Sequence, residues 1–174
     1  MGFKREDYMR KNSKGFSLIE LLIVVAIILI IAAIAIPNLL RSRIAANQAS
    51  AVGSLRTLNT ANITYASTYN TGYSAALSYL GPAAGGGLPT VLGAGLVDSI
   101  LGGTGSQVSA KSGYNFTYAP GATDNSGRIN KYNFNANPVT PGTTGTNYYF
   151  TDESGVIRQN STAVAGSSDS PIGG

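Results

Sequence analysis

The sequence contains neither cysteine nor histidine in its 174 residues. The absence of cysteine excludes a disulfide, a thiol nucleophile, a thiolate metal site and a lipidated cysteine. The absence of histidine removes the commonest general base and the commonest metal ligand together. The few acidic residues are scattered among predicted turns and give no pattern of a nucleophile–base pair or a metal shell. The sequence therefore predicts a protein that is not an enzyme and holds no cofactor.

Positive charge is also scarce beyond the first fifteen residues. Residues 1–15 carry five basic and two acidic side chains, which account for three of the four net positive charges of the chain. The remainder is close to neutral, so the basic isoelectric point gives no reason to expect nucleic-acid binding.

One long apolar run dominates the N-terminal part of the sequence. Phe16–Ile36 is apolar apart from one serine and Glu20, and Pro37 follows it. At about 1.5 Å per helical residue, roughly 21–25 residues reach about 31–37 Å, which is enough to cross a bilayer. Basic residues before this run outnumber Arg41 and Arg43 after it, so the positive-inside rule predicts a single span with a cytoplasmic N-terminus. The chain beyond Pro37 is then exported.

A single acid, Glu20, lies near the start of this run. A carboxylate at bilayer depth costs about 2.5–3.5 kcal/mol on insertion scales, so an acid retained there is expected to have a partner and a function. An ordinary secretory signal cut near Ala33–Ala35, or an uncut anchor, would also account for the apolar run. Glu20 and the basic segment that ends at Gly15 argue against both.

The helical pattern continues beyond Pro37 over residues 38–70 but becomes amphipathic. The predicted apolar stripe consists of Ile44, Val52, Leu55, Leu58 and Ile63. Asn59 is expected on the polar face. Pro37 removes a backbone donor and clashes with the preceding turn, so a bend or a local melt of the helix is predicted there.

The C-terminal part alternates aromatic and polar residues with a period of two. Strands are predicted at 114–118, 132–136, 148–151 and 156–158. Turn sequences rich in Asp, Asn, Pro and Gly separate them. Each predicted strand has one aromatic and one polar face, which is typical of an antiparallel sheet with one side on a core.

Together these segments predict an α+β fold. A long N-terminal helix has a protruding transmembrane first half, and its second half packs on a small antiparallel sheet of about four strands. The predicted segments are a leader at 1–15, a transmembrane helix at 16–37 and an exported domain at 38–174. Within that domain we expect a helix at 38–70, a Gly-rich loop at 71–112 with a short helix at 95–101, a sheet at 113–160 and a flexible tail at 161–174.

The N-terminal segment resembles a known processing signal. Lys14–Glu20 (KGFSLIE), with its apolar continuation and Pro37, is similar to the class III signal of type IV pilins and the related pseudopilins. The resemblance implies that a membrane prepilin peptidase cuts between Gly15 and Phe16 and then N-methylates Phe16. It also implies that Glu20 is the acid through which the helices of this family assemble.

Simple electrostatics agrees with an assembly role for Glu20. Cleavage would create an ammonium group at Phe16, at the positive end of a helix dipole. Glu20 one turn later can offset that charge locally or pair with the ammonium of a neighbouring subunit. Such a staggered pairing would fix the axial register of helices, which approach closely at Ala26, Ala32, Ala33 and Ala35.

The same resemblance implies partners and a location. We expect a structural prepilin that polymerises as a homo-oligomer into a type IV pilus-like surface filament for adhesion, motility or DNA uptake. The implied partners are prepilin peptidase, an inner-membrane assembly platform, a motor ATPase and the membrane, with no specific nucleic acid. The chain is expected in the bacterial inner membrane before assembly, and in an extracellular pilus or periplasmic pseudopilus afterwards.

Two other functions are compatible with parts of the sequence. The first is a pseudopilin of a type II secretion system, which would share the same processing chemistry. The second is a membrane-anchored enzyme or sugar-binding domain, for which the sequence offers no catalytic constellation.

Other candidate sites are weaker. Asp152 and Glu153 are candidate calcium ligands in a hairpin turn, although so few carboxylates favour a solvated turn. The N-glycosylation pattern occurs at Asn62, Asn115 and Asn160, as chance predicts in a chain rich in Asn and Thr, and no role is assigned to it.

Overall fold

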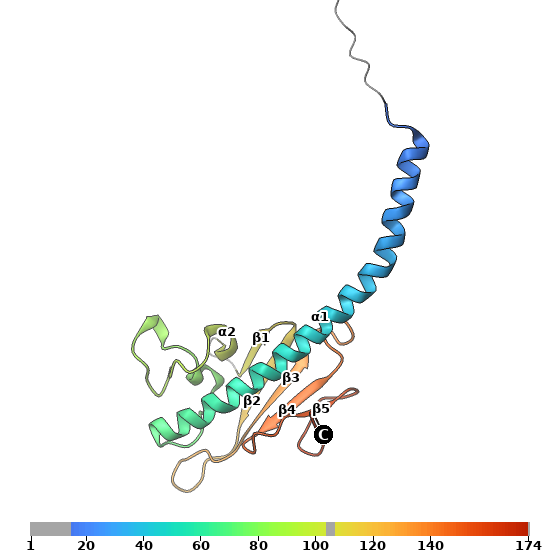
Figure 1. Ribbon diagram of the computed structural model, residues 1–174. Helices are drawn as coiled ribbons and strands as arrows, with labels where there is room; N and C mark the ends of the chain where they lie inside the picture. The colour runs from blue at the N-terminus through green and yellow to red at the C-terminus, as the bar shows by residue number, and fades with distance from the viewer. Residues whose placement is uncertain (1–14, 104–106, 174) are drawn as a thin grey trace, which may run out of the picture. The chain divides into compact units, whose positions relative to one another are not determined.

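The computed structural model describes residues 15–103 and 107–173. The chain forms two units, residues 1–39 and residues 40–174, and helix α1 (Leu18–Tyr69) contributes to both. The predicted leader lies outside the described residues except for Gly15. Figure 1 shows α1 as the blue-to-green helix at the start of the chain.

Helix α1 runs without interruption through Pro37. The local melt predicted at this proline is therefore absent from the single chain. A proline removes one backbone donor, and one lost hydrogen bond leaves the rest of a long helix able to propagate on either side.

The second half of α1 buries one stripe on the sheet. Its buried apolar side chains are Ala51, Leu55, Leu58, Ala61 and Tyr65. The predicted stripe is correct at Leu55 and Leu58 but wrong at Ile63, whose side chain is 51% exposed. Five residues separate Ile63 from Leu58, and at about 100° per residue this places Ile63 well away from the buried face.

Two asparagines lie inside this contact. Asn59 was predicted on the polar face, but its Nδ2 donates to Thr151 Oγ1 (2.8 Å) and its Oδ1 accepts from the Tyr132 hydroxyl (3.1 Å). Asn62 is fully buried, and its Nδ2 donates to the Tyr118 hydroxyl (3.2 Å). The sheet thus supplies hydroxyl partners that make these polar residues compatible with burial. Burial also removes Asn62 as an accessible glycosylation acceptor.

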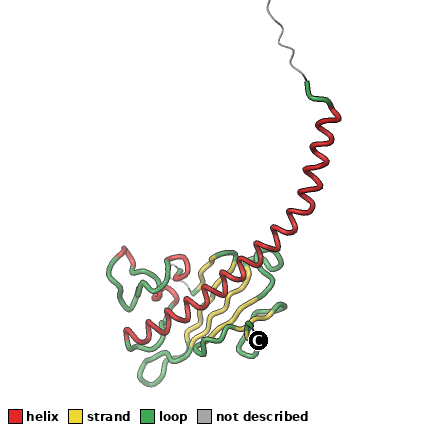
Figure 2. The backbone as a smooth tube through the Cα atoms, viewed as in Figure 1, coloured by secondary structure: helices red, strands yellow, loops and turns green. Residues whose placement is uncertain are grey.

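The sheet has six strands rather than the predicted four or so, all antiparallel and in sequence order. They are β1 (Val108–Lys111), β2 (Tyr114–Pro120), β3 (Tyr132–Pro138), β4 (Tyr148–Asp152), β5 (Arg158–Asn160) and β6 (Ser170–Pro171). Figure 2 shows the second half of α1 in red lying across these strands in yellow. The two extra strands, β1 and β6, are short edge strands that carry no aromatic alternation, so the sequence pattern does not reveal them.

The aromatic alternation predicted for β2 and β3 is confirmed. The inward-facing residues are Tyr114, Phe116 and Tyr118 on β2 and Tyr132, Phe134 and Ala136 on β3, and none is more than 3% exposed. The predicted fourth run begins later than expected, because Val156 and Ile157 precede the first paired residue of β5. Ile157 is nevertheless buried in the core.

The Gly-rich segment contains short helical turns, η1 (Leu77–Leu80), η2 (Ala84–Gly86) and α2 (Ser99–Gly102). Helix α2 is shorter than the predicted helix and begins at Ser99, because the Asp98 carboxylate caps it by accepting from the backbone of Ile100 and Leu101. Lys111 of β1 pairs with the same carboxylate at 2.8 Å. Its ammonium and these backbone donors hold the pKa of Asp98 below its ordinary value.

The last residues are attached to the sheet, although the sequence predicts only a flexible tail there. The Asp169 carboxylate accepts from Asn160 Nδ2 (3.0 Å) and from the backbone of Gly166 (2.8 Å). Arg158 donates to the backbone carbonyl of Asp169 (2.9 Å). These bonds hold residues 166–171 beside β5 without a disulfide.

Gly145→Ala is expected to lower the free energy of unfolding by about 1–3 kcal/mol through overpacking. A Cβ at this position would collide with the hydroxyl and ring of Tyr114, and Tyr114 is fully buried. Thermal unfolding of the detergent-solubilised chain, followed by near-ultraviolet circular dichroism of the tyrosines, measures the change. The control is Gly166→Ala, where no atom lies within 4 Å of the added Cβ. Equal melting temperatures for the two variants would contradict the packing argument.

Candidate functional site

The first half of α1 exposes a continuous apolar surface. Its large apolar side chains from Phe16 to Ile36 are 46–87% exposed, and the most apolar 18-residue window contains no buried residue. This helix is long and apolar enough to cross a membrane. An apolar surface of this extent marks a site that another apolar environment covers, either lipid or protein.

Glu20 lies in the first turn of α1 and caps it. Glu20 Oε2 accepts a hydrogen bond from the backbone N–H of Ser17 at 2.9 Å, and the Ser17 carbonyl accepts from Leu21 at 3.2 Å. Ser17 therefore occupies the N-cap and Glu20 the third helical position of a capping-box sequence. The carboxylate is thus placed at the positive end of the helix dipole.

Sequence reasoning missed this capping role. The signal was present, since a serine followed three residues later by glutamate at the start of an apolar run is typical of a helix N-terminus. The free-energy cost of a charge at bilayer depth instead favours the hypothesis of a partner outside the helix.

The Gly15–Phe16 bond lies outside the helix. Residues 15–17 have no regular secondary structure, and α1 begins at Leu18. Phe16 is 87% exposed, and no atom lies within 4 Å of the position of a Cβ on Gly15. The bond is therefore sterically open in a non-helical segment, which is the form in which a protease can bind a peptide.

Pro37 has a polar neighbour that bonds to the helix backbone. Asn38 Nδ2 donates to the Ile34 carbonyl at 3.0 Å. The carbonyl that Pro37 leaves without a backbone donor is that of Ala33, four residues earlier, so the Asn38 amide bonds to the next carbonyl along the helix and adds one hydrogen bond beside the proline.

The acidic turn after β4 is closed by hydrogen bonds of its own. The Asp152 carboxylate accepts from the backbone N–H and the hydroxyl of Ser154, as in a hydrogen-bonded turn, while Glu153 is exposed. Within residues 15–103 and 107–173, no group of three or more acidic side chains could hold a metal ion.

The N-terminal segment is similar to those of known proteins. The family model described as the prokaryotic N-terminal methylation motif matches residues 10–36. The type IV wide pilus major component PilA4 of Thermus thermophilus is 68% identical over 37 residues, which cover 21% of this chain and 28% of that protein. The type IV major pilin protein PilA of Myxococcus xanthus is 49% identical over 57 residues, which cover 33% and 26%.

The similarity is confined to the N-terminal part. The chain spans only about a quarter of the length of these curated relatives. No solved structure matches it. Both relatives are named as pilus components rather than enzymes, in agreement with the non-enzymatic function that the composition predicts.

Asn38→Ala is expected to loosen the helix at Pro37. A net hydrogen bond contributes about 0.5–1.5 kcal/mol, so amide exchange of the neighbouring turn should become about two- to tenfold faster. Hydrogen–deuterium exchange of the chain in detergent micelles measures this effect. Leu39→Ala is the matched control, because it shortens an adjacent exposed side chain that is apolar. Equal exchange rates in the two variants would show that the amide has no such role.

Proposed function

Because its N-terminal segment is that of the type IV pilin and pseudopilin family, we propose that this chain is a prepilin, the precursor of a structural subunit of a type IV pilus-like filament. Prepilin peptidase cuts it between Gly15 and Phe16 and methylates the new N-terminus. An inner-membrane platform and a motor ATPase then polymerise it. The observation that carries the proposal is the exposed apolar half of α1, in which no residue of the most apolar window is buried and whose first turn carries a capping acid.

The exposed apolar half of α1 would be covered first by lipid and then by other copies of the same helix. Before assembly, residues 16–37 would lie in the inner membrane, with the N-terminus in the cytoplasm. After assembly, copies of the same helix would cover one another in the filament core. Lipid tails are as apolar as these side chains, so close packing between helices, rather than the removal of apolar surface from water, would hold the helices together once they leave the membrane.

The hydrogen bond at Ser17 limits what Glu20 can still do. One carboxylate oxygen accepts from the Ser17 N–H, which leaves Oε1 for a second partner. Cleavage supplies that partner as the ammonium of Phe16, on the same chain or on a neighbour. An interchain pair would set the axial stagger of the helices, and the intrachain pair would reduce the cost of keeping both charges in an apolar core.

Pro37 is the position at which a filament would gain extensibility. In the single chain the helix is continuous there, so any melting would be driven by the packing of neighbouring subunits. A high-resolution map of the fibre with an unbroken helix through Pro37 would exclude this part of the proposal.

The first prediction concerns processing. The mature protein purified from its host is expected to begin at N-methylated Phe16, as determined by mass spectrometry of the N-terminal peptide. A mature chain that begins at Ile36, as after an ordinary signal peptidase, or still at Met1, would contradict the prepilin assignment.

The second prediction concerns assembly. Glu20→Ala should insert into the membrane normally or more easily, because a charge costing about 2.5–3.5 kcal/mol is removed, yet sheared surface fibres should be lost. Immunoblots of membrane and sheared fractions measure both effects. Glu20→Asp is the matched control, since it keeps the charge on a shorter side chain. Normal fibres from Glu20→Ala cells would exclude the pairing mechanism.

A strain in which the gene is deleted distinguishes a pilin from a pseudopilin. Loss of surface fibres on deletion of the gene supports the pilus function. Loss of exoprotein secretion with fibres intact would assign the chain to a type II secretion system instead.

A further inference from the structure

Two arginines follow directly after the apolar first half of α1. Residues 21–40 carry no charged side chain, and Arg41 and Arg43 come next. The helix surface remains apolar beyond Pro37, because the side chains of Leu39 and Leu40 are 68% and 50% exposed. Exposed leucines followed at once by cations are typical of a helix end that passes from hydrocarbon into a polar layer.

Neither arginine has an anionic partner in the described structure. Both side chains are exposed, and the Lys111–Asp98 contact is the only ion pair within residues 15–103 and 107–173. No acidic residue occurs between Glu20 and Asp98 along the sequence. Because Arg41 and Arg43 are two residues apart, at about 100° per residue they lie on opposite sides of the helix. A single protein surface cannot cover both sides, whereas lipid headgroups surround a helix.

The position of the two arginines along the helix matches the headgroup layer of a bilayer. With residues 16–37 as the proposed span, Arg41 and Arg43 lie about 6 and 9 Å beyond Pro37, at about 1.5 Å per residue. The polar layer on each side is about 5–8 Å thick, since the hydrocarbon core takes up about 30 Å of the roughly 40–45 Å bilayer. Side chains of an α-helix tilt toward its N-terminus, which here is toward the membrane. Both guanidinium groups can therefore reach lipid phosphates.

We propose that Arg41 and Arg43 bind the phosphate groups of phospholipids in the outer leaflet and anchor the subunit there before assembly. This inference rests on the membrane stage of the proposed function and names the group that the chain binds at that stage. A guanidinium presents its N–H donors in a planar fork and forms two parallel hydrogen bonds with phosphate oxygens. The contact therefore fixes the depth of the helix more firmly than a diffuse attraction of charges.

Removal of the leader gives this anchor a direction. Before cleavage, the five basic side chains of residues 1–15 hold the inner end of the helix, and the two arginines hold the outer end. Cleavage leaves one ammonium at the inner end, on Phe16, which Glu20 can neutralise. Movement toward the cytoplasm would draw both arginines through hydrocarbon, whereas outward movement would draw only the neutralised pair. The mature subunit is held against inward slippage and released for outward extraction.

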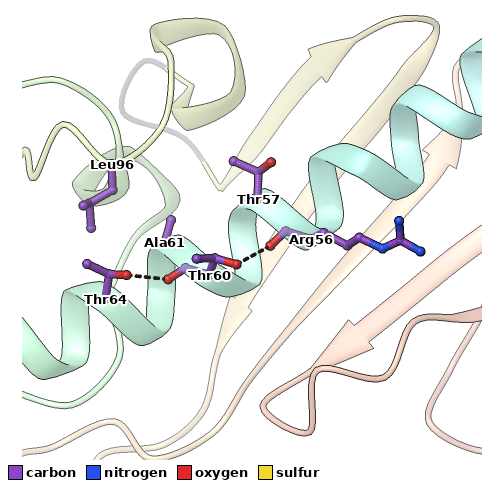
Figure 3. Close-up of a pocket in the computed structure, with 6 residues that line it drawn as sticks. All are labelled: Arg56, Thr57, Thr60, Ala61, Thr64 and Leu96. Carbon is purple, nitrogen blue, oxygen red and sulfur yellow. Dashed lines mark hydrogen bonds between the residues drawn. The ribbon is translucent and has the colours of Figure 1, made fainter.

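Arg56 is the matched control for this contact. It is exposed on the same helix and forms no ion pair, but it follows Arg43 by 13 residues, a rise of about 20 Å. Figure 3 shows its side chain pointing away from the neighbouring Thr60, Thr64 and Leu96. An arginine at this level lies beyond the reach of the phosphates that Arg41 and Arg43 bind.

Solid-state NMR distance measurements between arginine carbon Cζ and lipid phosphorus test the contact. The full chain, labelled at arginine, is reconstituted into phosphatidylglycerol vesicles in a phosphate-free buffer, so that all phosphorus belongs to lipid. A charge-assisted contact places Cζ about 4 Å from phosphorus, and the arginine signal is then dephased. The double variant Arg41→Gln, Arg43→Gln should lose about half of the dephased signal, since the arginines of the leader contribute the same background to every sample. Arg56→Gln should lose none.

The depth of the helix provides a second measurement. The chain has no cysteine, so Leu39→Cys carries a single nitroxide label whose depth is read by paramagnetic relaxation. In phospholipid vesicles the label should move deeper by about 3–5 Å, up to one helical turn, when both arginines are replaced by glutamine. In galactolipid vesicles, which lack phosphate, the chain with both arginines should already show the deeper position.

The outcomes separate this inference from the function on which it rests. Equal dephasing in the original chain and the double variant would exclude the contact, and an equal loss with Arg56→Gln would reduce it to nonspecific attraction and overturn it. Equal depth in phospholipid and galactolipid vesicles would show that phosphate is not the ligand. A chain that fails to cross the bilayer, as judged by protease digestion, would refute the membrane stage together with the contact. If the chain crosses the bilayer without dephasing at these arginines, the proposed function stands and the contact alone is wrong.

Discussion

The folded unit of this protein, residues 40–174, depends on one contact, between a single stripe of helix α1 and the aromatic face of the sheet. Leu55, Leu58 and Tyr65 belong to the same core as the rings of β2 and β3, among which the Tyr118 and Phe134 centroids lie 4.7 Å apart. The chain has no disulfide to close this region, so removal of the helix would expose the whole aromatic face. The exposed apolar segment is the first half of the same helix. That segment and the folded domain therefore share one continuous backbone.

Polar groups inside that contact determine how the helix lies on the sheet. An apolar stripe on a smooth aromatic face could slide by a turn at little cost, since burial is nondirectional. Asn59 and Asn62 each bond to a hydroxyl of a different strand, so a shifted helix would leave buried amides without partners. An unsatisfied buried group costs about 1–3 kcal/mol, and two of them are enough to select one register.

The sequence predicts those features whose physical cause is local. Helix α1, its apolar first half and the aromatic alternation of β2 and β3 follow from periodicity, and the processing motif follows from a contiguous segment. The features it misses depend on partners far along the chain. The helical pattern places Asn59 on the surface, because its partners Thr151 and Tyr132 lie far along the chain. Strand β6 is too short to show any pattern. The capping role of Glu20 was readable, but the cost of a membrane charge obscured it.

The edges of the sheet have a consequence for how this protein can polymerise. One edge is a four-residue strand that ends in a lysine, and the other is a two-residue strand that ends in Pro171, which has no backbone N–H. Such edges disfavour the addition of a further strand from another molecule. The β-rich domain is thereby protected from the cross-β aggregation that a crowded array of aromatic strands would otherwise favour. In the proposed filament, contacts between the apolar helices would then drive growth, and the sheet edges would add no strand pairing between subunits.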